Sequence, residues 1–407
     1  MLQNKPISYI EISKKNLLHN FRALKKITHL VTEIAAVIKS NAYGHGQDEV
    51  AKILEPHADY FQVNSVAELE LLRKVSRKKT FLLGYVQKSD LVKAIKLGCI
   101  LSVFSLEQLK NIELAVARLN LGRVGKQKIK QEIHIPIDAH LGREGILENQ
   151  WSEFFKEVKK SNNLKLSGIY AHFANIEDTT NFSHAKKQVE KYKRAVALAA
   201  EHGFAELKTH ISATSGLLIH ENTLSLGMKK KGENSIVRLG ICLYGLWPSE
   251  YIRTLYQRKL ELKPVLNLKT KIAQVKTLPA EHTIGYGLTY KTEKNTKIAV
   301  IPVGYADGYD RGFSNIGEVL IRGTRCRILG RVAMNMFVVD VNHLKGVKAE
   351  EEVVLIGRQF ARNASNVAGA DGEENEITAE ELAKKIDTIN YEITTRLNPL
   401  LPRIVKN

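Results

Sequence analysis

A lysine stands at the end of an apolar run near the start of the chain. The segment is AAVIKSNAYGHG, residues 35–46, in which Lys39 comes directly before a turn rich in Gly, Asn and His. A short apolar run bounded by glycine is typical of an interior parallel strand, and lysine is rarely buried without a partner. An amine in this position indicates a catalytic or binding site, although a lysine at a strand end can also extend its charged head to water.

Other polar residues follow apolar runs further along the chain. If Lys39 binds an aldehyde cofactor as a Schiff base, the site needs groups for a phosphate, a partner for the cofactor ring, and an acid and a base for the substrate. The candidates are Tyr43, Arg143, His172, Ser215, Arg238, Gly240 and Ile241. Taken singly, each has a structural interpretation, as an ion-pair member, a core histidine, a helix cap or a close-packing glycine. Together they favour a site.

Eight short apolar runs between about residues 33 and 245 predict the strands that would position these groups. Helical patterns alternate with the runs, and two of the helices begin with capping boxes, Ser65 with Glu68 and Ser105 with Gln108. This alternation favours an α/β fold of the (β/α)8 barrel type, although the count alone also fits a doubly wound sheet. Active sites of such barrels lie at the C-terminal ends of the strands, where Lys39 falls.

The pattern changes after residue 258. Closely spaced strand-like segments with glycine or charged breaks replace the long helical periods, until a closing helix that Thr378 and Glu381 are expected to cap. We therefore predict an N-terminal barrel at residues 1–258 and a C-terminal, mainly β domain at residues 259–407.

Composition excludes several classes of protein. The 407 residues carry 61 Lys and Arg against 43 Asp and Glu, a net charge of +18, but the basic clusters are short and lack interleaved aromatic residues, so no nucleic-acid partner is expected. The histidines show no HxH or HExxH spacing, so no metal is expected. The absence of a signal-like start or a long apolar window predicts a cytoplasmic protein without membrane contact. Cys99, Cys242 and Cys326 are predicted to be buried free thiols.

The lysine segment resembles the corresponding motif of bacterial alanine racemases, which use pyridoxal 5'-phosphate (PLP). The resemblance continues in the family's order through GREG, YAHFA, VRLGICLYG, IGYGLTY, PVGYADGY and INYEI, from about residue 7 to residue 404. It implies a PLP-binding barrel followed by a β domain, an isomerase that interconverts L- and D-alanine, and a homodimer. The role that it implies is the supply of D-alanine for peptidoglycan, the cell-wall polymer.

The resemblance also implies a role for each matching residue. Lys39 would bind PLP and act as the base on D-alanine, and Tyr286 would act on L-alanine in the site of the other subunit. Arg238 would bond the pyridine nitrogen, and His172 would link it to the catalytic tyrosine. Groups for the phosphate would be Tyr43, Ser215, the amides of Gly240 and Ile241, and Tyr391. Groups for the substrate carboxylate would be Arg143 and the amide of Met334, and groups at the substrate entrance would be Tyr305, Arg311 and Arg331.

The chain departs from the family in two stretches. In HIPIDAHLGREG, Pro136 stands where the family usually has a lysine that is often carbamylated and steadies the arginine. Arg143 then needs another anionic partner, and the candidates are the neighbouring Glu144 and a bound anion. Ala139 and His140 replace a Thr-Gly pair in the same stretch, and Asn335 replaces an aspartate in AMNM.

Three alternatives compete with an alanine racemase. A non-catalytic PLP-binding protein of the single-barrel kind would lack the β domain and Tyr286. A PLP decarboxylase on the same barrel would want an acidic ring partner instead of Arg238. A racemase of broader specificity is the strongest alternative, because the altered carboxylate loop and entrance could admit larger side chains.

Overall fold

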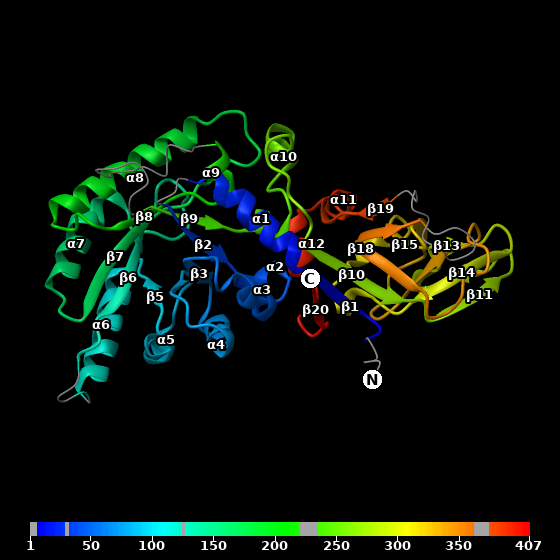
Figure 1. Cartoon of the computed structure of the whole chain (residues 1–407), viewed down its shortest axis with the longest axis horizontal. Helices are drawn as coiled ribbons and strands as arrows, with labels where there is room; N and C mark the ends of the chain where they lie inside the picture. The colour runs from blue at the N-terminus through cyan, green and yellow to red at the C-terminus, as the bar shows by residue number, and fades with distance from the viewer. Residues whose placement is uncertain (1–5, 29–31, 122, 124–126, 220–234, 362–373) are drawn as a thin grey trace. The chain divides into compact units, whose positions relative to one another are not determined.

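The structure is a computed structural model that describes residues 6–28, 32–121, 123, 127–219, 235–361 and 374–407. The chain forms two compact units (Figure 1). One consists of Leu18–Ala42 and Val50–Leu262, and the other of Met1–Leu17, Tyr43–Glu49 and Lys263–Asn407. Two helices belong to both units. Helix α1 (Lys14–Lys26) and helix α3 (Gln47–Leu54) each begin in the unit that contains Lys263–Asn407 and end in the unit that contains Val50–Leu262.

The first unit is built on eight parallel strands, as the sequence predicted. In spatial order they are β8 (Lys208–His210), β7 (Leu164–Tyr170), β6 (Gln131–Pro136), β5 (Ile100–Ser102), β4 (Thr80–Leu82), β3 (Tyr60–Val63), β2 (Glu33–Val37) and β9 (Ile236–Leu239). Isolated parallel bridges from Thr209 to Ser235 and from Ala213 to Arg238 join β8 to β9. The sheet is thereby nearly closed, which confirms the (β/α)8 barrel.

Helices alternate with these strands and lie outside the sheet (Figure 1). They are α4 (Val66–Val75), α5 (Leu91–Leu97), α6 (Leu106–Leu121), α7 (Trp151–Lys160), α8 (Ser183–Glu201), α9 (Thr214–Ile219) and α10 (Glu250–Tyr256). Helix α7 shows why they pack there, because Trp151, Phe154, Phe155 and Val158 form a buried stripe at helical spacing. The predicted caps are present: the amides of Glu68 and Gln108 donate to Ser65 and Ser105.

Side chains fill the inside of the barrel. Ala35, Tyr60, Phe81, Ile100 and Ile236, from five different strands, form one buried cluster. The rings of Tyr60 and Phe81 stack with their centroids 4.7 Å apart. The barrel interior is therefore a packed core and not a pore, although some buried polar side chains, such as His134 and His210, also lie within it.

The second unit is mainly β, as predicted. Its larger sheet runs in the order β11 (Gln274–Leu278), β14 (Thr296–Ile301), β17 (Phe337–Asp340), β16 (Thr324–Leu329), β15 (Glu318–Ile321), β18 (Glu352–Phe360), β10 (Leu266–Lys271), β1 (Tyr9–Ser13) and β20 (Arg403–Lys406). Strand β19 (Glu374–Ile377) pairs with β18, and β12 (Thr283–Ile284) pairs with β13 (Tyr290–Lys291). The closing helices are α11 (Ala379–Lys385), capped by Thr378, and α12 (Asn390–Thr395).

Two further facts bear on function. Cys99, Cys242 and Cys326 are free and buried, as the sequence predicted. Among the described residues, no helix has the length and apolar character needed to cross a membrane.

Candidate active site

Lys39 follows β2 at the C-terminal end of the barrel strands and opens an unusual turn. Ser40, Asn41, Ala42 and Tyr43 all have φ between 52° and 54°, which makes the segment labelled α2 (Lys39–Tyr43) a left-handed turn. Left-handed geometry costs an L-residue about 1–2 kcal/mol, so neighbouring contacts must hold it. One such contact is the Ser40 amide, which donates to the carboxylate of Glu68 over 2.7 Å.

The surroundings of Lys39 favour its uncharged form. Burial is the main cause that lowers the pKa of the Lys39 amine, and the positive charge of Arg143 lowers it further; Glu68 and Glu144 oppose this shift, and Arg238 adds the smallest lowering effect. A larger fraction of the amine is therefore neutral near pH 7 than in a free lysine. A neutral amine is the form that attacks an aldehyde carbon.

Arg238, on β9, is a buried cation held by backbone and histidine acceptors. Its Nη1 donates to the carbonyl of His210 over 2.8 Å and lies 2.6 Å from His210 Nδ1. Its Nη2 donates to the carbonyl of Ala171 over 2.8 Å and lies 3.3 Å from His172 Nδ1. Within the described residues, Nε is the guanidinium nitrogen for which no acceptor is found. One N–H of a fixed, charged group is thus left for a ligand.

The neighbouring histidines are neutral, and their hydrogen bonds define which nitrogen carries the proton. Burial and Arg238 lower the pKa of His172 to about 3 and that of His210 well below its ordinary value. Because a guanidinium can only donate, Nδ1 of both rings must accept, and the proton of each ring lies on Nε2. His172 therefore presents an Nε2–H donor on the side opposite Arg238.

Arg143, in the loop after β6, is paired with its neighbour in the chain. Both Nε and Nη2 of Arg143 donate to the carboxylate of Glu144, the latter over 2.8 Å. This bond raises the pKa of Arg143 and lowers that of Glu144. Pro136 ends β6 and has no amine to modify, and the structure confirms Glu144 as a partner of Arg143. The side chain of Arg143 remains 62% exposed, so it is free to meet a ligand.

Ser215, Gly240 and Ile241 lie in two neighbouring turns at the same end of the barrel. Ser215 is in the first turn of α9, and its hydroxyl donates to Glu177 over 2.8 Å. The Gly240 amide approaches Thr214 Oγ1 at 3.4 Å, and Ile241 begins the short 3-10 helix η4 (Ile241–Tyr244). Amides at the start of such turns lack partners within the turn, so they can serve an anion.

The remaining predicted residues belong to the unit with the β domain. The rings of Tyr43 and Tyr391 have their centroids 6.0 Å apart. Tyr305 and Met334 lie in adjacent loops, since the amide of Ala306 donates to the Met334 carbonyl over 3.0 Å. Tyr286 begins the short 3-10 helix η5 (Tyr286–Leu288) and is 74% exposed. Arg331 places its guanidinium beside Gly287, and Arg311 begins another 3-10 turn, η7 (Arg311–Phe313).

The structure thus brings together one part of the predicted set and leaves the rest in the other unit. Gathered at the C-terminal end of the barrel are Lys39, Arg143, His172, Ser215, Arg238, Gly240 and Ile241. Two contributors went unrecognised in the sequence: Glu68, which was assigned only to a cap, and His210, which holds Arg238. The available signal for His210 was its position at the end of a short strand beside the strand of Arg238.

Comparisons with known proteins match the chain over almost its whole length. The N-terminal domain of alanine racemases matches residues 12–248, and the C-terminal domain of alanine racemases matches residues 265–405. An alanine racemase of Leptospira interrogans is 33% identical over 98% of this chain and 95% of its own length. The chain belongs to the alanine racemase family.

Solved structures of alanine racemases agree with this assignment. The enzyme of Clostridium difficile 630 superimposes with a TM-score of 0.85 at 29% identity, covering 99% of this chain and 97% of that one. The enzyme of Bacillus anthracis, solved with bound L-Ala-P, gives a TM-score of 0.83 at 30% identity, with 99% and 96% covered. Both the barrel and the β domain are therefore those of alanine racemases.

Proposed function

We propose that this chain interconverts L- and D-alanine with PLP through two bases, Lys39 and Tyr286. The family assignment supplies the reaction and the cofactor. The observation that supports the assignment of roles is the position of Lys39, an amine of lowered pKa among Arg143, His172 and Arg238.

The described residues fit PLP. Lys39 offers an amine to its aldehyde, and Nε–H of Arg238, for which the described residues supply no acceptor, offers a donor to its ring nitrogen. The phosphate would be held by Ser215, the amides of Gly240 and Ile241, Tyr43 and Tyr391; Ser215 would exchange its bond to Glu177 for one to the phosphate. When bound, PLP supplies an electron-withdrawing ring that makes the α-proton of an amino acid removable.

Arg238 accounts for the choice of reaction. Burial lowers its pKa, but a guanidinium starts so high that it stays charged and does not give its proton away. The ring nitrogen would therefore receive a hydrogen bond without a proton, which limits how far electrons are withdrawn. That limit favours simple return of a proton over decarboxylation, the alternative chemistry of this barrel.

The two bases would work on opposite faces of the substrate. Lys39 would take or return the α-proton on the D side, and Tyr286 of a second subunit would do so on the L side. His172 supports this arrangement, because its Nε2–H can donate to the phenolic oxygen of that tyrosine. A homodimer is part of the proposal.

Arg143, fixed by Glu144, would bind the substrate carboxylate together with the amide of Met334. A planar guanidinium can hold one carboxylate on each edge, so the pairing with Glu144 leaves room for a second anion. Tyr305, Arg311 and Arg331 would line the entrance. The alternative within the same chemistry is a racemase that accepts larger side chains, since the loop of Ala139 and His140 and the residue Asn335 differ from the family.

Three wider expectations belong with this proposal. The product D-alanine would serve peptidoglycan synthesis. The cytoplasmic location stays a prediction. We also propose a functional division of the chain between residues 258 and 259, which the two family matches at residues 12–248 and 265–405 support.

Two measurements test the two bases separately: covalent attachment of PLP, and exchange of the α-proton with deuterated water. We expect Lys39→Ala to lose covalent attachment of PLP, measured as cofactor retained after borohydride treatment and denaturation. Tyr286→Phe should retain PLP and exchange on D-alanine but lose exchange on L-alanine. Tyr290→Phe, which removes a hydroxyl four residues away, should behave as wild type. Retained exchange on L-alanine in Tyr286→Phe would mean that another group is the second base.

A further inference from the structure

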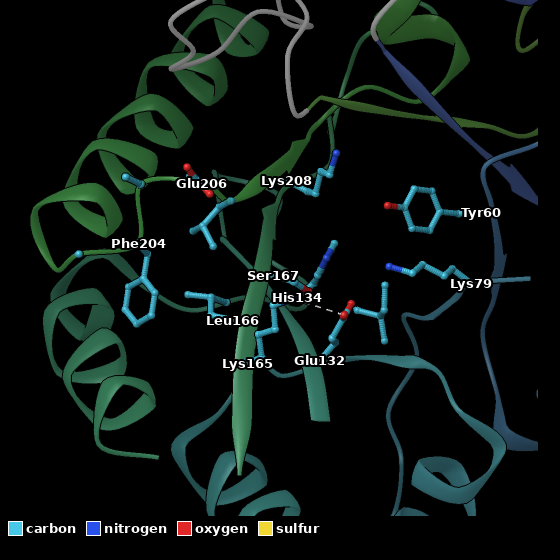
Figure 2. A pocket seen from close by; sticks show the side chains of 14 residues that line it. Tyr60, Lys79, Glu132, His134, Lys165, Leu166, Ser167, Phe204, Glu206 and Lys208 are labelled. Atoms are coloured by element: carbon cyan, nitrogen blue, oxygen red, sulfur yellow. Dashed lines mark ion pairs between the residues drawn. The ribbon is translucent and has the colours of Figure 1, made fainter. Parts of the chain in front are cut away.

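A cavity opens at the end of the barrel opposite Lys39. Its volume is about 590 Å³, within the range of small-molecule sites. Its walls come from the N-terminal ends of β3, β5, β6, β7 and β8 and from the residues just before β4 and β8 (Figure 2). Catalytic groups of barrels lie at the other end, so this cavity is separate from the site already described.

Most charges on the walls of this cavity are already paired. Lys208 forms an ion pair with Glu33 over 2.7 Å, and Lys165 forms one with Glu132 over 3.7 Å. Among the described residues, Lys79 has no ion-pair partner, and Figure 2 shows its Nζ directed into the cavity from the side opposite Glu206. Glu206 is exposed at the outer wall. Lys79 and Glu206, both exposed, are therefore the charged lining residues that remain without an ion pair in the described part of the chain, and they lie on opposite walls.

A buried hydrogen-bond donor also faces this cavity. His134, which is 1% exposed, lines the wall, and its Nδ1 lies 2.8 Å from Nε2 of His210. Since the proton of His210 lies on Nε2, Nδ1 of His134 accepts and its own proton lies on Nε2. Burial, with the charge of Arg238, lowers the pKa of His134 to about 3, so the ring is neutral. No acceptor for Nε2–H is found among the described residues, so this N–H is left for a ligand in the cavity that His134 lines.

We propose that this cavity binds a small anion carrying a carboxylate or phosphate group, held by the ammonium of Lys79 and the Nε2–H of His134. The ammonium of the exposed Lys79 supplies charge, and His134, which is 1% exposed, supplies a directed donor. Lys165 and Lys208 also line the cavity, but the carboxylates of Glu132 and Glu33 offset their charges.

An anion in this cavity would be connected to the cofactor end by a continuous chain of hydrogen bonds. The chain runs from His134 through His210 to Arg238, with separations of 2.8 and 2.6 Å. An anion that accepts from His134 polarises each following bond in the same direction, because hydrogen bonds in a chain strengthen one another. Arg238 would then be held more strongly. This consequence rests on the proposed function, in which Arg238 bonds the PLP ring.

Calorimetric titration of the PLP-loaded protein with inorganic phosphate, and separately with succinate, tests the site. We expect saturable binding of at least one of the two, weakened at least tenfold in Lys79→Ala and restored in part in Lys79→Arg. Lys74→Ala is the matched control, since it removes the same charge from an exposed position of α4 outside the cavity. The better binder identifies the anionic group. No saturable binding, or equal binding by Lys79→Ala and Lys74→Ala, would overturn the proposal.

Two spectroscopic signals, recorded in the same titrations, report on the two ends of the hydrogen-bond chain from His134 to Arg238. The 15N resonance of His134 Nε2 should shift with the calorimetric midpoint, and the absorption band of bound PLP should shift with it. An unshifted His134 would overturn the site, and a shifted His134 with an unmoved PLP band would overturn the connection to Arg238. None of these measurements depends on racemisation, so failure of the anion site and failure of the proposed function are distinguishable.

Discussion

At the scale of single residues, the pair of Arg143 and Glu144 replaces a support that Pro136 cannot provide. We predict that Glu144→Gln raises the KM for alanine about tenfold, equivalent to about 1.4 kcal/mol of binding, with a smaller effect on kcat. The reason is that the guanidinium loses the charged partner that fixes its plane. Glu148→Gln is the control, because Glu148 forms a comparable exposed pair with Arg194 over 3.1 Å. An unchanged KM in Glu144→Gln would contradict the role.

The buried histidines predict how stability depends on pH. The folded-state pKa of His134 is about 3, below the unfolded value of about 6.5, so the unfolded chain binds more protons between these values. The stabilisation is fully present above pH 6.5 and is lost as the pH falls toward 3. One such histidine adds a slope of up to about 1.4 kcal/mol per pH unit. Urea unfolding between pH 4 and 7 should show a shallower slope for His134→Gln than for wild type; equal slopes would refute this.

At the scale of elements, the left-handed turn after Lys39 is a strained segment held by its surroundings. We predict that Ser40→Val destabilises the fold by about 1–2 kcal/mol and lowers kcat, because a β-branched residue fits φ near 52° poorly. Ser40→Gly should fold at least as well as wild type, since glycine adopts positive φ freely. Urea unfolding and kcat measure both effects. Equal stability of the valine and glycine variants would show that the turn is not strained.

Sequence patterns predicted the elements that depend on local signals. The eight barrel strands and the caps at Ser65, Ser105 and Thr378 were visible because apolar runs and capping residues are short-range features. The left-handed turn was not, since it depends on Glu68, which lies 28 residues from Ser40. The pairing of β1 with β10 was equally hidden, because Tyr9 meets Lys269 across a large sequence separation.

The residues of the candidate site also divide into those that local sequence patterns indicated and those that such patterns did not. Lys39 and Arg238 were found from their positions at strand ends, and the family resemblance supplied Tyr286, which no local pattern marks as reactive. The role of His210 depends on a side-chain contact between two strands, 2.6 Å from Arg238, and such contacts are not encoded in periodicity.

At the scale of the whole molecule, the proposal requires that one active site draws on two chains. We predict that mixing inactive Lys39→Ala dimers with inactive Tyr286→Phe dimers, under conditions that exchange subunits, restores about a quarter of wild-type activity. Half of the dimers would then be hybrids, each with one intact site. Mixing Lys39→Ala with Lys39→Arg is the control and should stay inactive. No recovery after verified exchange would place both bases in one chain.

The time course of the optical rotation of L-alanine, incubated with the purified protein and PLP, tests the central claim most directly. Enantiomers have equal free energy in water, so a racemase must bring the rotation to zero from either side. The account predicts decay to zero from both L- and D-alanine. Decay only with larger amino acids such as serine, lysine or arginine would favour the broader racemase. Constant rotation with every amino acid, despite bound PLP, would contradict catalysis and leave a PLP-binding protein.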